Sequence, residues 1–323
     1  MDQSSLIPLR DIGPGALRVA AACGLALAAQ SAASAQTGRD AIVVQGERLT
    51  PEAARRQANA FVRTTGVAAS ETPAARWTDP VCPRVLGLTP AGARSAENMM
   101  RAIAIQVGAQ LAAEPCAPNI VVSFTADAAA VVREVERREP RRLSELSAVE
   151  RRALLEGSAP VRWWHTSELR DSSGGNGGQG RTATAQMTPA THDGSGAGSD
   201  LANDVPTTMR YSNSIISTYA QRNLLSATVI VDQDAVMGRR LSAIAAYAAM
   251  VALAEIRPTD ASPAGSILGL FTAPIPPSRL TAQDLGFLRT LYRMPLDRQA
   301  RYHRGTLVAG MVSATSTETA AGD

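Results

Sequence analysis

The polar and aromatic residues best suited to chemistry lie together in residues 160–170, PVRWWHTSELR. Successive side chains of a β-strand point to opposite faces, so an extended strand here places Arg162, Trp164 and Glu168 on one face. An aromatic ring beside a cation and a carboxylate suits a sugar ring or an extended peptide. We therefore predict that these three residues bind a ligand. The alternative is an edge strand whose tryptophan covers the core and whose polar face is solvated.

The same stretch suggests a second interpretation, a periplasmic hydrolase with a non-metal mechanism. His165 and Glu168 could join a hydroxyl such as that of Ser266 in a nucleophile, base and acid arrangement. His165 and Glu168 point to opposite faces of a regular strand, however, and the sequence contains no G-x-S-x-G nucleophile elbow. We therefore assign no catalytic residue, and the hydrolase stays the alternative.

Metal and cofactor sites are not expected from the sequence. Beyond residue 35 the chain has two cysteines and three histidines, with no C-x-x-C and no closely spaced histidine pair. It has no Walker A loop, and no G-x-G-x-x-G follows a predicted strand. We predict neither a metal ion nor a cofactor.

The helix around which the chain is organised is expected at residues 241–256, after a β-branched run at 227–231 and a polar turn. It is apolar nearly all the way round, and such a helix packs in the middle of a fold. From Leu241 to Leu253 its only ionisable side chain is the phenol of Tyr247. We therefore add Tyr247 to the predicted binding residues and expect the rest of the helix to form core.

The first 35 residues have the pattern of a secretory signal peptide. Arg10 and Arg18 precede an apolar run at 19–29, and an A-x-A cleavage site ends at Ala35. The sequence predicts a periplasmic or secreted protein that has no stable membrane span after cleavage. The alternative is a protein tethered to the inner membrane by an uncleaved N-terminus.

Export changes the interpretation of the cysteines, because the periplasm allows oxidation. Cys82 and Cys116 are the cysteines beyond the signal peptide, and we predict a disulfide between them. Closing a loop of this length stabilises a fold by about 4 kcal/mol in the chain-entropy model. The alternative is two buried free thiols.

The charge of the chain does not favour nucleic acid as a partner. All 32 basic residues are arginine and the net charge is +3. The densest arginine region, residues 133–152, interleaves glutamates with its arginines, which is typical of a solvated, salt-bridged face. We expect no nucleic-acid binding, and the predicted partner is an envelope protein, a peptide or a glycan.

The chain is predicted to form one main domain of the α/β (α+β) class, with a mixed sheet, a buried central helix and a helical C-terminal subdomain. An N-terminal helix and linker at 36–76 precede the domain; the helix has Thr50 as its N-cap and Gly66 as its stop. The domain spans 77–312, with a disordered insertion at 171–208 and a disordered tail at 313–323.

Two kinds of element fill the domain. Residues 81–88 and 119–125 are expected to be strands joined by a long helix after Thr89, a β-α-β unit. Residues 209–219 and 224–232 are expected to be antiparallel strands. The predicted helices lie near 128–138 and 147–156, and in the C-terminal part after residues 262, 281 and 297.

The C-terminal third contains Ser266-Ile-Leu-x-Leu-Phe271, followed by Leu280-Thr281-x-x-Asp284-x-x-Phe287-Leu288-x-x-Leu291-Tyr292. With the order of elements, these strings resemble secreted bacterial proteins with a domain of unknown function, whose scaffold is similar to that of zincin metallopeptidases. The resemblance covers roughly residues 77–292. It implies a zincin-like fold with the active-site helix at 240–256.

In active zincins that helix carries His-Glu-x-x-His, whose histidines bind zinc while the glutamate polarises the metal-bound water. Here the helix has no histidine, and its one carboxylate, Glu255, lies in the last turn. The resemblance therefore implies a scaffold without the metal. The function we expect is a non-catalytic envelope binding or interaction module.

Overall fold

The structure is a computed structural model that describes residues 50–171, 218, 220–258 and 261–321. The predicted signal peptide and almost all of the predicted insertion at 171–208 lie outside these residues. The described residues all fall within one compact unit, Glu47–Asp323. In them the chain forms seven α-helices and a five-stranded sheet.

The sheet is mixed, as predicted. Its strands follow the order β4, β5, β3, β2, and β1 pairs with the first half of β5. All pairs are parallel except β4 with β5, which is antiparallel, so β4 is an edge strand. The strands are β1 (Ala75–Arg76), β2 (Pro83–Leu86), β3 (Ile120–Thr125), β4 (Val161–Asp171) and β5 (Ala220–Asp232).

The predicted β-α-β unit is confirmed as β2, α2 (Pro90–Val107) and β3. Helix α2 begins where Thr89 accepts a hydrogen bond from the Gly92 N–H, and it ends at Gly108, which has a left-handed backbone. β2 then pairs in parallel with β3. The predicted disulfide also forms: Cys82, just before β2, bonds Cys116, just before β3, with 6.2 Å between their Cα atoms.

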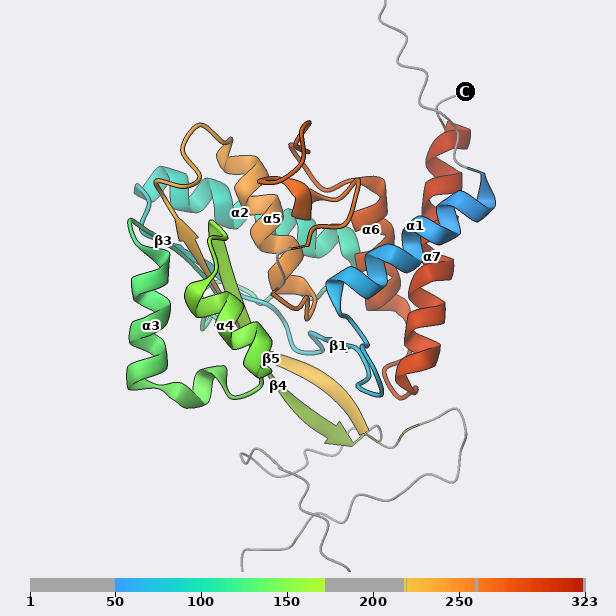
Figure 1. Ribbon diagram of the computed structural model, residues 1–323, viewed down its shortest axis with the longest axis horizontal. Coiled ribbons are helices and arrows are strands. Elements are labelled where there is room, and N and C mark those ends of the chain that lie inside the picture. Colours follow the sequence, from blue (N-terminus) through green and yellow to red (C-terminus); the bar gives the residue numbers. More distant parts are fainter. Residues whose placement is uncertain (1–49, 172–217, 219, 259–260, 322–323) are drawn as a thin grey trace, which may run out of the picture. The chain divides into compact units, whose positions relative to one another are not determined.

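Two helices cover one face of the sheet, α3 (Ala128–Arg138) and α4 (Ala148–Glu156) (Figure 1). A capping box between Ser147 and Glu150 begins α4, the helix predicted near 147–156. A short 3₁₀ turn, Pro140–Leu143, links the helices. Together with the sheet they bury a small apolar cluster: Ala128, Val132, Leu143, Leu154, Trp164 and Ile230.

The opposite face of the sheet is covered by α5 (Leu241–Leu253), the predicted core helix. Every residue from Ala243 to Leu253 is buried. Its many alanines let α2 pack closely beside it in the main core. Of the residues that the structure describes, none belongs to a helix long and apolar enough to cross a bilayer.

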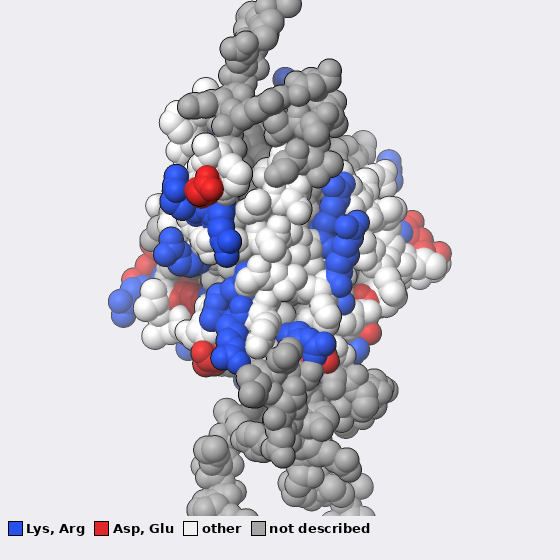
Figure 2. Space-filling view, turned by 90° about the vertical axis from the view of Figure 1, so that its right-hand side faces the viewer, with Lys and Arg blue, Asp and Glu red and all other residues white. Residues whose placement is uncertain are grey.

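Three further helices form the side of the molecule that lies on the right in Figure 1 and faces the viewer in Figure 2: α1 (Pro51–Thr65), α6 (Ala282–Arg293) and α7 (Ala300–Ala321). Helix α1 begins and ends at the predicted Thr50 and Gly66. The rings of Phe61 on α1 and Phe287 on α6 lie 5.1 Å apart. The N-terminal helix is therefore packed into the main core.

Some details differ from the sequence prediction. The predicted strand at 209–219 lies almost wholly outside the described residues, and the antiparallel partner of β5 is β4. The segment predicted as linker contains β1, because Ala75 and Arg76 pair with β5. Helix α7 continues to Ala321, beyond its predicted end at Val312.

Candidate functional site

Arg162, the predicted cationic contact on β4, lies beneath α4 and is 7% exposed. Its guanidinium donates hydrogen bonds of 2.5–3.0 Å to the carbonyl oxygens of Leu154, Gly157 and Ala159. Carbonyls at the C-terminal end of a helix lack partners within the helix and attract a cation. Burial lowers the pKa of Arg162. The side chain therefore anchors the end of α4 to the sheet.

Trp164 and Glu168 are both engaged within the fold. Trp164 is 2% exposed, because α3 and α4 cover it. Glu168 pairs with Arg170, and Arg170 also binds the Asp79 carboxylate at 2.6 Å. Hydrogen bonding from Arg170 lowers the pKa of Asp79. Ligand binding by these β4 residues stays a prediction from the sequence, and the proposal below does not depend on it.

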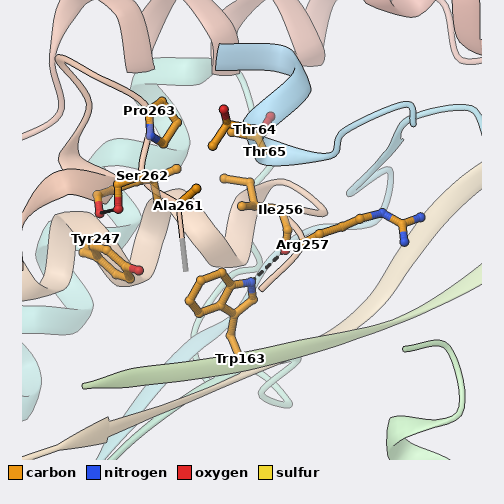
Figure 3. Close-up of a pocket in the computed structure, with 10 residues that line it drawn as sticks. Thr64, Thr65, Trp163, Tyr247, Ile256, Arg257, Ala261, Ser262 and Pro263 are labelled. Carbon is orange, nitrogen blue, oxygen red and sulfur yellow. Dashed lines mark hydrogen bonds between the residues drawn. The ribbon is translucent and has the colours of Figure 1, made fainter. Parts of the chain in front are cut away.

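Tyr247, the fourth predicted residue, lies on the other face of the sheet and lines a small pocket (Figure 3). Its ring packs edge-on against those of Trp163, at 6.1 Å, and Phe271, at 5.3 Å. Burial raises the pKa of the Tyr247 phenol, which keeps the hydroxyl neutral. The indole N–H of Trp163 donates to the Ile256 carbonyl at 2.7 Å.

The size and charge of this pocket limit what it can hold. Its volume is about 20 Å³, which is room for about one water molecule. The cation in its wall, Arg257, is paired with the Glu150 carboxylate at 2.8 Å. Burial opposes the charge on Glu150, but hydrogen bonds from Ser147 and Arg257 hold its pKa below the usual value. The described residues of the pocket therefore offer neither the volume nor a free charge for a larger ligand.

The three residues of the hydrolase interpretation each have a partner elsewhere. His165 is buried, and its Nε2 lies 2.8 Å from the Val251 carbonyl oxygen, so this nitrogen is the donor. Ser266 donates to the Asp284 carboxylate at 2.6 Å. Glu168 is paired with Arg170. No hydrogen bond among the described residues links His165, Ser266 and Glu168.

Several buried polar groups could not be recognised from the sequence. Arg222 on β5 binds both oxygens of Glu255, and it also donates to the Ser167 hydroxyl at 2.8 Å. Glu255 was expected in the last turn of the core helix but lies two residues beyond the end of α5, and its carboxylate neutralises a cation of the sheet. The neighbouring Asn223 is fully buried, and its amide has no hydrogen-bond partner among the residues that the structure describes. Only the fold brings these groups together, because they lie far apart in the sequence.

Metal ligation finds no support in the described ranges. Within residues 50–171, 218, 220–258 and 261–321, no group of three or more His, Cys, Asp or Glu side chains is placed so that it could hold a metal ion.

The exposed charge is distributed unevenly over the described helices. Around α3 and α4 the predicted salt-bridged face is confirmed: Glu134 pairs with Arg137 and Arg138, and Glu136 lies 3.2 Å from Arg151. On α1, α6 and α7 the balance differs, because Glu52 is the only exposed carboxylate among their described side chains. We call the solvent-accessible arginines of these three helices the arginine face: Arg55, Arg56, Arg63, Arg289, Arg293, Arg301 and Arg304.

Figure 2 shows basic side chains gathered in bands on the side where α1, α6 and α7 lie, with an uncharged strip between the bands. Across the described residues, Arg55, Arg56, Arg63 and Arg293 form no ion pair. Arg304 is anchored, since it donates to the carbonyls of Ala68 and Ser70. This face was missed in the sequence, because its arginines are spread over 250 residues of chain and no run of basic residues marks it.

Comparison with known proteins identifies no relative: no protein family model matches the chain, and neither a curated protein nor a solved structure is similar to it.

Proposed function

We propose that this protein is a non-catalytic binding module of the bacterial cell envelope and that it binds an anionic partner through the arginine face. The observation that carries the proposal is the group of exposed arginines on α1 and α6 that have no ion-pair partner in the described part of the chain. Exposed cations of one sign attract an anionic partner and orient it during encounter.

The interior supports a binding role over catalysis. Buried polar side chains such as His165, Asp284, Arg162 and Arg222 are engaged in hydrogen bonds within the fold. An enzyme needs some of these groups turned toward a substrate in a cleft. Apart from the buried amide of Asn223, the polar groups that we expect to meet another molecule are the exposed arginines of the described helices.

Export and scaffold belong to the same proposal. The pattern of residues 1–35 favours secretion with cleavage after Ala35, and the Cys82–Cys116 disulfide is compatible with an oxidising compartment. The zincin-like scaffold is supported by the order of elements, in which β5 leads into the buried α5 and helices follow. An experimental structure whose sheet and α5 do not superpose on zincins would remove that part of the proposal.

The binding role can be tested with an immobilised polyanion. We expect the full exported chain to be retained on a heparin column, because the arginine face meets the sulfates. Arg55→Gln, Arg56→Gln and Arg63→Gln together should shift elution to clearly lower salt. Glutamine preserves helix propensity, so the fold of α1 should be kept.

The control is a second triple variant, Arg137→Gln, Arg138→Gln and Arg142→Gln, which changes the net charge equally. These arginines lie beside glutamates on the salt-bridged face. Elution should move little in this variant. Equal shifts in the two variants, or a wild-type protein that flows through the column, would refute binding through the arginine face.

A further inference from the structure

The arginine face has a layout that points to one class of anionic partner. Helix α7 contacts both α1 and α6, and its exposed residues after Arg304 are small and uncharged, including Gly305, Thr306 and Ala309. A Cβ added at Gly305 would meet nothing within 4 Å. Basic side chains therefore lie on both sides of an uncharged strip (Figure 2), which an extended anionic surface can approach.

We propose that the arginine face docks the protein on a bilayer surface containing anionic phospholipid; this inference rests on the proposed function and names its partner. Arginine binds phosphate with two parallel N–H···O hydrogen bonds, and its aliphatic stem lies against less polar material. Each basic residue near an anionic bilayer strengthens binding by about fivefold.

The chemistry of the face predicts peripheral binding without insertion. Among the described residues of the arginine face and the strip, Tyr302 is the exposed aromatic side chain; the guanidinium of Arg301 lies over its ring at 5.1 Å. Tyrosine favours the headgroup level of a membrane. The described side chains of the strip include no large exposed aliphatic residue that would enter the acyl chains. Charge attraction therefore supplies most of the binding, and salt should reverse it.

Phospholipid fits this face better than nucleic acid does. Single strands are held by aromatic side chains on which successive bases stack, and a lone tyrosine does not form such a platform. Sequence reading of a duplex needs a helix or ribbon that enters the major groove, whereas α7 is flanked by α1 and α6. The predicted export also places the protein beside membranes.

The test is co-sedimentation of the full exported chain with vesicles. One set contains equal parts of phosphatidylglycerol and phosphatidylcholine, and the other contains phosphatidylcholine alone. We expect binding to the anionic set only, and release as salt rises. The Arg55, Arg56 and Arg63 triple glutamine variant should bind roughly a hundredfold more weakly, three steps of about fivefold. The Arg137, Arg138 and Arg142 control should bind like the wild type.

Lysine at positions 55, 56 and 63 should restore most of the binding, which separates charge from a loss of structure. Circular dichroism melting of each variant checks that it folds. The salt dependence of binding is measured on the wild type, so that part of the test does not depend on any variant folding. Equal binding to both vesicle sets, or binding that salt leaves unchanged, overturns the lipid inference.

Outcomes on heparin and on vesicles distinguish the two proposals. In one outcome, the protein is retained on heparin through the α1 arginines and yet fails to bind anionic vesicles. This result removes the lipid inference and leaves the proposed function in place. In another outcome, the protein binds duplex DNA through Arg55, Arg56 and Arg63 and leaves the vesicles unbound. That result also removes the lipid inference, and it identifies nucleic acid as the partner. A wild-type protein that binds neither the heparin column nor the anionic vesicles removes both proposals.

Discussion

Two buried histidines couple the stability of this fold to pH. The Nδ1 of His303 accepts a hydrogen bond from the Ala74 N–H at 3.0 Å, while its Nε2 donates to the Pro295 carbonyl. His165 donates to the Val251 carbonyl. Burial lowers the pKa of both imidazoles. Protonation of His303 would also place a second donor against the Ala74 N–H.

We therefore expect the free energy of unfolding to fall as the solution is acidified. The pKa of each histidine is lower in the folded state, while in the unfolded chain it is about 6.5. The contribution of each is complete above that pH and is lost as pH falls through and below it, because the unfolded chain then binds protons that the folded chain does not. Urea denaturation at pH 7.5 and at pH 5.5 measures the change.

The double variant His165→Gln, His303→Gln is the control, because glutamine does not titrate. The charged neighbours of the two imidazoles are left unchanged in this variant: Glu255 and Arg222 near His165, and Asp297 and Arg298 near His303. A variant that loses as much stability on acidification as the wild type would contradict the assignment to these histidines.

For single residues, the sequence predicted local features correctly but did not predict contacts between residues that lie far apart in the chain. The strand around residues 160–170 could be predicted from its composition. The packing of helices over Arg162 and Trp164 could not be predicted, because α4 contacts β4 through tertiary interactions that residue spacing does not reveal. The pairing of β4 with β5 also shifts register between Thr166 and Ser167, where β5 contains one extra residue, Leu225, and this irregularity could not be read from the sequence of β4.

At the scale of elements, the contact between α6 and α7 depends on glycine. A Cβ at Gly310 would lie 2.0 Å from Oγ1 of Thr290 on α6, and a Cβ at Gly286 would lie 2.7 Å from the Cβ of Ala314. The missing side chains let the two helices approach closely, and this contact helps to place the arginines of α7 beside those of α6.

We predict that Gly310→Ala destabilises the protein by about 2 kcal/mol, because overpacking forces the helices apart. Gly305→Ala in the same helix is the matched control, since its added methyl meets nothing within 4 Å. It should stabilise the protein by up to about 1 kcal/mol through helix propensity. Chemical denaturation compares the two, and equal effects would refute the packing argument.

Helix starts marked by a capping residue were the part of the fold that could be predicted best, whereas the helix expected after residue 262 is only a 3₁₀ turn at Ile267–Gly269. Thr50, Thr89, Ser147 and Thr281 all cap helices as expected, because the capping residue and its partner lie within one turn of each other. The two-residue β1 was missed, since its pairing with β5 depends on residues more than 140 positions away.

At the scale of the whole molecule, the disulfide closes the loop that contains α2. The cysteines are 34 residues apart. Reduction should lower the free energy of unfolding by about 4 kcal/mol, because the unfolded chain regains the entropy of an open loop. Denaturation with and without reductant measures this loss, and a Cys82→Ser, Cys116→Ser variant that is insensitive to reductant serves as the control.

The intact mass of the exported protein tests both the Cys82–Cys116 disulfide and the predicted cleavage of the signal peptide. We expect a chain that begins at Gln36 and that gains the mass of two hydrogens on reduction. A mass that includes residues 1–35 would favour the tethered alternative, and an unchanged mass on reduction would mean two free thiols.

The composition of the arginine face has a practical consequence for labelling. Guanidinium groups do not react with the usual amine-directed reagents, and the chain contains no lysine. A fluorophore ester therefore couples only at the α-amino group. A single dye can then report on the protein at a membrane while every basic side chain of the arginine face keeps its charge.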